Sequence, residues 1–92
     1  MILYAQVECI VYEAQSLKQK RSVLKKIITR IQNDYNIAIS EMDYQDLWQR
    51  TMFGLVTISS NKVSSERLMN QALALIDSFP EIERANTTFE WL

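Results

Sequence analysis

The chain has 92 residues, of which 48% are hydrophobic and 23% charged, with one glycine and one proline. This length suffices for one hydrophobic core but not for two, so we expect a single domain over residues 1–92. The composition excludes the disordered and fibrous classes. No apolar run approaches the roughly 20 residues that span a bilayer, and the N-terminus lacks a basic, apolar leader. We therefore expect a cytoplasmic protein that does not enter a membrane.

The first part of the chain predicts a strand and then a helix. Residues 2–12 alternate in a β-rich composition, which predicts a strand that buries Leu3, Ala5, Val7, Cys9 and Val11 on one face. Cys9 is the only cysteine, so we expect a buried, reduced thiol. Ser16 and Gln19 have the spacing of a capping box, and an amphipathic helix is predicted from about Leu17 to about Asp34, closed by Asn36.

The second part predicts two strands, a helix and a last strand. Strands are expected over residues 37–43 and 50–59, joined by a polar connection that carries aromatic residues. In residues 50–59, Phe53, Leu55 and Thr57 alternate with Met52, Gly54, Val56 and Ile58. The second helix is predicted to open near Asn61 or Ser64 and to stop at Pro80. Alternation from Ala85 to Leu92 predicts the final strand.

This order of elements predicts an α+β fold of the ferredoxin-like βαββαβ kind. Two right-handed strand–helix–strand units give a four-stranded antiparallel sheet with both helices on one face. The other face is left open and is expected to expose some of Tyr4, Ile10, Tyr12, Phe53 and Leu55. Because so much apolar surface is unusual on a small monomer, we expect a homodimer or another protein partner to cover it, in preference to stacked RNA bases.

Two segments carry a family resemblance. Residues 16–25 read SLKQKRSVLK and residues 43–50 read DYQDLWQR, with Gly54 following inside the third strand. The chain resembles the YlxP-like family of small bacterial proteins, which has an SLKxKR segment at the first helix and a DxxDLWQR/K segment before the third strand. The resemblance covers essentially the whole chain. It implies a ferredoxin-like fold, a bacterial cytosolic setting, an association with ribosomes or RNA, and no enzymatic activity.

The charge of the chain is unevenly distributed. Residues 14–33 hold six bases and no acid, whereas the other residues hold four bases and eleven acids, so the net charge of −1 divides into +6 and −7. The six bases are Lys18, Lys20, Arg21, Lys25, Lys26 and Arg30. Such a helix presents a basic band to a polyanion, although a solvated helix face is the ordinary explanation of a charge run.

The start of this helix is a candidate anion site. Cations are electrostatically disfavoured near a helix N-terminus, yet Lys18, Lys20 and Arg21 lie there beside the backbone N–H groups near Ser16. A phosphate would be bound by this combination. The alternative is that Lys20 or Arg21 pairs with Glu13, Asp43 or Asp46.

The second segment offers little for catalysis. Two carboxylates three residues apart, Asp43 and Asp46, need more ligands to hold a metal, and the chain has no histidine. We expect no catalytic residue, metal or cofactor. The predicted role is architectural, in which Asp46 caps a turn, Trp48 anchors it in the core, and Arg50 pairs with a nearby acid.

These patterns lead to two functional hypotheses. The first is a non-enzymatic module that binds RNA or a ribosomal particle through the basic band. The second is a homo-oligomeric regulatory domain of the ferredoxin-like type, in which the helix start holds a small anion. Steep loss of binding with salt would favour the first hypothesis, because affinity for a polyanion falls with each phosphate contacted.

Overall fold

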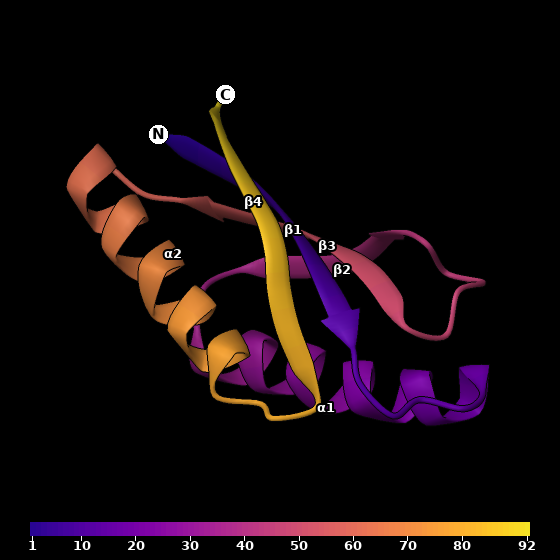
Figure 1. Ribbon diagram of the computed structural model, residues 1–92. Helices are drawn as coiled ribbons and strands as arrows, with labels where there is room; N and C mark the ends of the chain where they lie inside the picture. The colour runs from indigo at the N-terminus through magenta and orange to yellow at the C-terminus, as the bar shows by residue number, and fades with distance from the viewer.

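The computed structural model describes residues 1–92 and has the predicted order of elements. They are β1 (Ile2–Val11), α1 (Leu17–Asp34), β2 (Ala38–Asp43), β3 (Arg50–Ile58), α2 (Lys62–Asp77) and β4 (Ile82–Trp91). The strands form one antiparallel sheet in the order β2-β3-β1-β4, and the two helices lie on the same side of it (Figure 1). The predicted ferredoxin-like α+β fold is confirmed.

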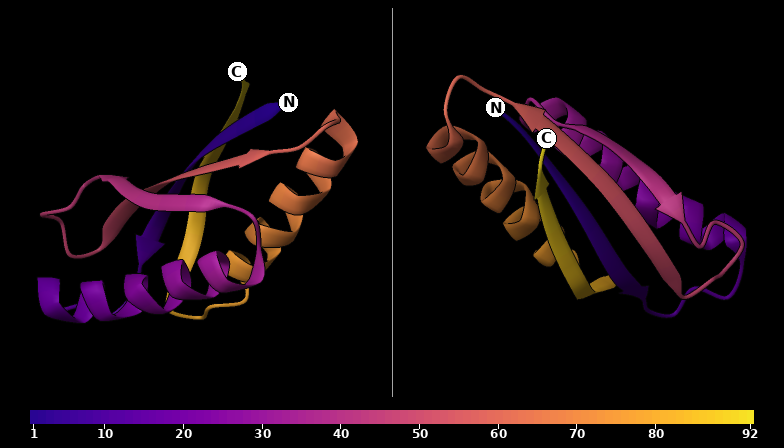
Figure 2. Two further views of the ribbon diagram at one scale, coloured as in Figure 1. Left: turned by 180° about the vertical axis from the view of Figure 1, so that it is seen from behind. Right: turned by 90° about the horizontal axis from the view of Figure 1, so that it is seen from above.

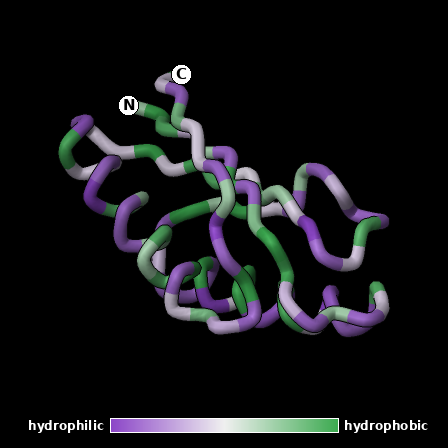
Figure 3. Tube along the Cα trace, in the orientation of Figure 1, coloured by the Kyte–Doolittle hydropathy of each residue, from purple (hydrophilic) through white to green (hydrophobic).

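Strand β1 is one of the two inner strands, and the core is built on it. It pairs with β3 on one side and β4 on the other, and its five odd-numbered residues from Leu3 to Val11 are all buried. Helix α1 adds Leu24, Ile27 and Ile31 to the same core. Figure 3 shows hydrophobic and hydrophilic positions interleaved along the chain, as expected for elements that each bury one face.

Helix α1 is capped as the sequence predicts. Ser16 Oγ accepts the N–H of Gln19 at 3.1 Å, and Gln19 Oε1 accepts the N–H of Gln15 at 2.7 Å. The second hydrogen bond of the capping box therefore forms with the N–H of Gln15, the residue before the N-cap, and not with that of Ser16. The prediction that Asn36 closes the helix is wrong, because Tyr35 is the C-cap, with extended backbone at φ −135°.

Strand β3 corrects one prediction about the open face. Phe53 and Leu55 are fully buried against the helices, and Met52, Val56 and Ile58 lie on the face that the helices leave open. The buried face also accommodates two hydroxyl groups. Thr57 donates to the carbonyl oxygen of Asn36 at 2.8 Å, and Thr51 donates to Glu41 at 2.6 Å, so neither hydroxyl is buried without a partner.

The remaining boundaries differ by a few residues. Asn61 caps α2 by accepting the N–H of Ser64 at 2.8 Å, and the helix ends at Asp77, before Pro80. Strand β4 begins at Ile82, three residues earlier than predicted. Figure 2 shows β2 and β4 as the outer strands of the twisted sheet. Neither helix is both long and apolar enough to cross a membrane.

Candidate functional site

Lys20 is buried and is not one of the exposed cations of the basic band. Its side chain is 1% exposed, and its Nζ lies 3.0 Å from Glu41 Oε2 and donates to the carbonyl oxygen of Tyr44 at 2.6 Å. The helical spacing explains this, because Lys20 lies on the same stripe of α1 as Leu24, Ile27 and Ile31. The predicted alternative had Lys20 or Arg21 pair with Glu13, Asp43 or Asp46; in the structure Lys20 pairs with a different acid, Glu41.

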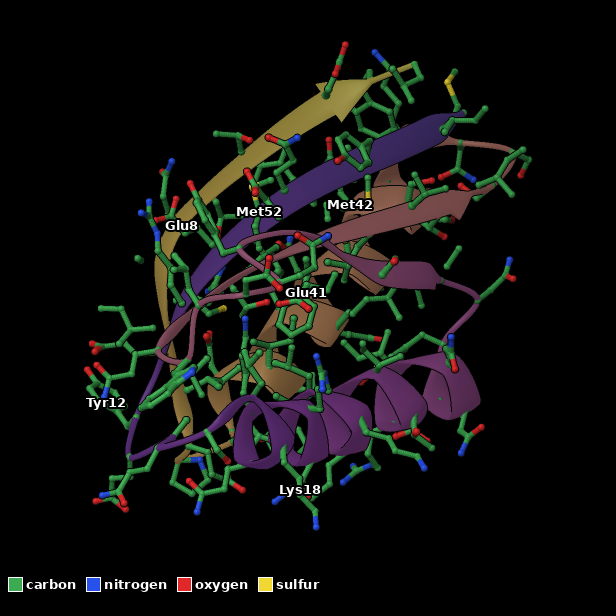
Figure 4. All side chains as sticks on the ribbon, turned by 90° about the vertical axis from the view of Figure 1, so that its right-hand side faces the viewer. Glu8, Tyr12, Lys18, Glu41, Met42 and Met52 are labelled. Carbon is green, nitrogen blue, oxygen red and sulfur yellow. The ribbon has the colours of Figure 1, made fainter.

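Three cations of α1 have no acidic partner. Lys18, Arg21 and Lys25 are exposed, and no carboxylate lies within ion-pair distance of any of them. At about 100° per residue they share one flank of the helix, beside the buried stripe. Figure 4 shows Lys18 on the side of α1 that faces away from the sheet. We call these three residues the basic flank.

The other two basic residues of α1 are neutralised. Lys26 pairs with Glu81, from the connection between α2 and β4, and this hydrogen bond lowers the pKa of the Glu81 carboxyl. Arg30 lies 3.5 Å from Asp34, one helical turn further along α1. Of the six basic residues from Lys18 to Arg30, the structure therefore leaves three free for a ligand.

The helix start keeps some unused hydrogen-bond donors. The Ser16 hydroxyl is occupied by the Gln19 N–H, whereas the N–H groups of Leu17 and Lys18 donate to no protein acceptor. Ser16 thus serves first as a cap. The predicted role of Ser16 in binding a phosphate stays a prediction.

The loop between β2 and β3 departs from its predicted role. Trp48 is 51% exposed and Leu47 is 48% exposed, so the prediction that Trp48 anchors the loop in the core is wrong. Asp46 makes no hydrogen bond; the turn is closed by the Leu47 N–H, which donates to the Tyr44 carbonyl at 3.0 Å. Asp43 accepts the N–H of Tyr44 at 2.7 Å. The loop keeps its shape through its backbone and through Tyr44, while its largest apolar side chains face solvent.

Arg50 pairs with an acid, as predicted. Its guanidinium donates to Glu8 Oε1 at 2.5 and 2.9 Å across the β1–β3 pair. It also stacks on the ring of Tyr44, 4.0 Å from the centroid, and Tyr44 has a positive φ of 64°. The hydrogen bond to Glu8 raises the pKa of Arg50. Arg50 is therefore engaged by protein groups on two sides.

On the open face of the sheet, side chains from neighbouring strands contact one another. A Cβ added at Gly54 would lie 2.7 Å from Met42 Cγ and 3.2 Å from the Tyr4 hydroxyl, so the glycine lets these two side chains lie across β3. Figure 4 labels Met42, Met52 and Glu8 on this face, and Glu8 on β1 is the register partner of Met52 on β3. At the sheet's end, Tyr12 hydrogen-bonds Glu83.

No group of three or more cysteine, aspartate and glutamate side chains is arranged to hold a metal ion. Cys9 is fully buried, and burial raises the pKa of its thiol to about 12. The thiol therefore remains protonated at neutral pH.

Comparison with known proteins places this arrangement in a family. Residues 2–89 match the family model described as a protein of unknown function, DUF503. The chain belongs to the DUF503 family. It is also 57% identical over 91 residues to a protein of Bacillus subtilis (strain 168) named "Uncharacterized protein YlxP", and the match covers 99% of each chain. The resemblance to the YlxP-like family is thereby confirmed.

For this DUF503 member, the two segments that carried the resemblance are in direct contact. Lys20, from the first segment, donates to the backbone of Tyr44, in the second. The sequence leaves open a pair between Lys20 and Asp43 or Asp46 of the second segment. It did not lead us to predict that Lys20 is buried or that its partners are Glu41 and the Tyr44 carbonyl. The helical period, which aligns Lys20 with Leu24 and Ile27, is the signal that could have revealed this burial.

Proposed function

We propose that this protein is an RNA-binding module without enzymatic activity, which associates with RNA or a ribosomal particle through the basic flank of α1. The supporting observation is that Lys18, Arg21 and Lys25 are exposed and unpaired although the chain holds more acids than bases. The other three bases of residues 14–33 are all paired. Three free cations on one flank form a surface suited to phosphate groups.

The spacing of the basic flank supports a polyanion over a small anion. Lys18 and Lys25 are seven residues apart, which is about 10 Å along a helix at 1.5 Å per residue. This span gives room for more than one phosphate group along the helix. A nucleic-acid backbone can supply them, because it repeats its phosphates along the strand.

A matched pair of double variants tests the proposal. Arg21→Gln/Lys25→Gln removes one arginine and one lysine from the basic flank, and Lys62→Gln/Arg67→Gln removes the same two residue types from α2. Each double variant changes the net charge from −1 to −3, and all four side chains are exposed and without an ion pair. Lys26 is kept because its loss would break the pair with Glu81.

Binding is measured by anisotropy with a labelled single-stranded RNA, and by co-sedimentation with ribosomal subunits at two salt concentrations. The α1 double variant is expected to bind more weakly than the α2 double variant at low salt. Its slope of log affinity against log salt should be smaller by about 0.7 for each phosphate that the variant no longer neutralises. Equal binding by the two variants contradicts the proposal. A shallow salt dependence with competition by inorganic phosphate would favour the regulatory, anion-binding domain.

A further inference from the structure

Strand β4 is an outer strand with a long free edge. It runs for ten residues and contains no proline or lysine, the residues that commonly block an exposed edge. The opposite outer strand, β2, has six residues and is interrupted by a register shift between Glu41 and Asp43. The sheet thus has one edge strand of six residues and one of ten, and each carries one register shift, which in β4 lies at Ala85.

Alternate residues of β4 point their backbone N–H and C=O groups toward the free edge. Leu92 donates its N–H to the carbonyl oxygen of Ile2 at 3.0 Å, so the groups of Leu92 point toward β1. In an antiparallel pair these directions alternate along the strand. The N–H and C=O groups of Thr87, Phe89 and Trp91 therefore point outward, away from β1.

The same three residues carry the side chains on the helix side of β4, and two of them are aromatic. Phe89 is 52% exposed and Trp91 is 36% exposed, although their register partners on β1 are buried. Lys62, at the start of α2, lies 5.3 Å from the centroid of the Trp91 ring, and both aromatic rings border a hollow of about 330 Å³ that Leu3 and Met69 also line. Exposed aromatic rings next to outward backbone groups favour an added strand as the ligand of this edge.

We infer that β4 pairs in an antiparallel manner with β4 of a second copy, around a two-fold axis at Phe89. The register between β1 and β4 shifts at Glu8/Cys9 and leaves Ala85 unpaired. A symmetric ladder of hydrogen bonds between two β4 strands is therefore regular only if it lies in residues 86–92. With the axis at Phe89, the outward groups of Thr87 face those of Trp91 from the second copy. The three outward positions of each chain then form six hydrogen bonds.

In this register no like charges lie directly opposite each other. Phe89 lies opposite Phe89 of the second copy, and aromatic cross-strand pairs are favourable. On the other face of the strand, Glu90 lies opposite Thr88, so no like charges oppose each other. This self-complementarity is the reason to assign the edge to a second copy of the chain, because a two-fold interface requires one surface to fit itself.

The oligomeric state tests the inference. Light scattering after size exclusion is expected to show twice the monomer mass as concentration rises to about 0.5 mM, a range in which even weak pairing is visible. Phe89→Lys, which opposes two ammonium groups across the axis, should weaken dimerisation at least about tenfold. Ile58→Lys, on the open face and 59% exposed in the parent, should leave it unchanged. Loss of the dimer in Ile58→Lys alone would assign the contact to the open face and overturn the inference.

Cross-linking tests the register. Phe89→Cys places two thiols across the axis at a Cα separation of about 5.5 Å, which a disulfide can bridge. The native Cys9 is buried and does not compete. Mild oxidation should give a covalent dimer of Phe89→Cys but not of Glu90→Cys, whose side chain lies on the other face and opposite Thr88. A monomer at every concentration together with no cross-linked Phe89→Cys dimer would overturn the inference even if RNA binding is intact.

Discussion

Lys20 donates a hydrogen bond of 2.6 Å to the carbonyl oxygen of Tyr44 from a position that is 1% exposed. The same ammonium group lies 3.0 Å from Glu41, whose carboxylate also accepts the Thr51 hydroxyl. One buried cation thereby joins the first turn of α1 to the end of β2 and to the start of the β2–β3 loop. It also fixes the backbone of Tyr44, which has a positive φ of 64°.

The first prediction concerns this contact. Lys20→Ala should lower the free energy of unfolding by about 3 kcal/mol, because it leaves Glu41 and the Tyr44 carbonyl without their shared partner. Lys18→Ala is the matched control, since Lys18 is exposed and unpaired, and its effect should stay within about 0.5 kcal/mol. Chemical denaturation measures both values. Similar stability of the two variants would show that Lys20 is dispensable for the fold.

The helical period and the strand alternation predicted the order of the elements and most buried positions, but not which face of β3 is covered. Both faces of that strand carry large apolar residues, Phe53 and Leu55 on one and Met52 and Val56 on the other. Which face of β3 is buried depends on the helices that pack against the sheet. Thr57 adds a polar hydroxyl to the buried face, and this hydroxyl donates to the carbonyl oxygen of Asn36. No local sequence pattern predicts that contact.

The second prediction follows from the exposure of Trp48. Trp48→Ala should lower the free energy of unfolding by about 1 kcal/mol or less, because half of the side chain is already in water. Phe53→Ala, at a fully buried position, should cost about 3–5 kcal/mol. Urea denaturation compares the two variants. A loss of several kcal/mol in Trp48→Ala would mean that the indole packs against the domain in solution.

Part of the candidate site was predictable and part was not. The run of six bases without an acid identified α1 as the basic element, and the arrangement of Lys18, Arg21 and Lys25 on one flank follows from the helical period alone. The neutralisation of Lys26 does not, because Glu81 is 55 residues away and reaches α1 only through the packing of α2 and β4. Contacts between distant segments decide which members of a charge run remain free.

The third prediction concerns Cys9. Burial raises the pKa of its thiol to about 12, so the reactive thiolate is scarce at neutral pH and the sulfur is also shielded from reagents. An aromatic disulfide reagent should therefore not react with the native protein. In denaturant the thiol should react at once, and its rate should follow the unfolded fraction. Rapid labelling under native conditions would show that β1 opens readily.

The last prediction concerns acid stability. The hydrogen bond from Lys26 holds the pKa of the Glu81 carboxyl below its ordinary value of 4.5. The unfolded chain therefore takes up this proton at a higher pH than the folded chain does, so the stabilisation is fully present above pH 4.5 and is lost as the pH falls through the lowered folded pKa.

Lys26→Gln should therefore weaken the acid-induced loss of stability, whereas Lys25→Gln should not. Lys25 is the matched control because it is the neighbouring exposed lysine, and it has no ion pair. At pH 7 the pair between Lys26 and Glu81 is worth about 1 kcal/mol or less, since both side chains are partly exposed. Thermal unfolding between about pH 3 and pH 7 follows this difference through the range in which carboxylates titrate. The same acid dependence in both variants would mean that the Lys26–Glu81 contact does not persist in solution.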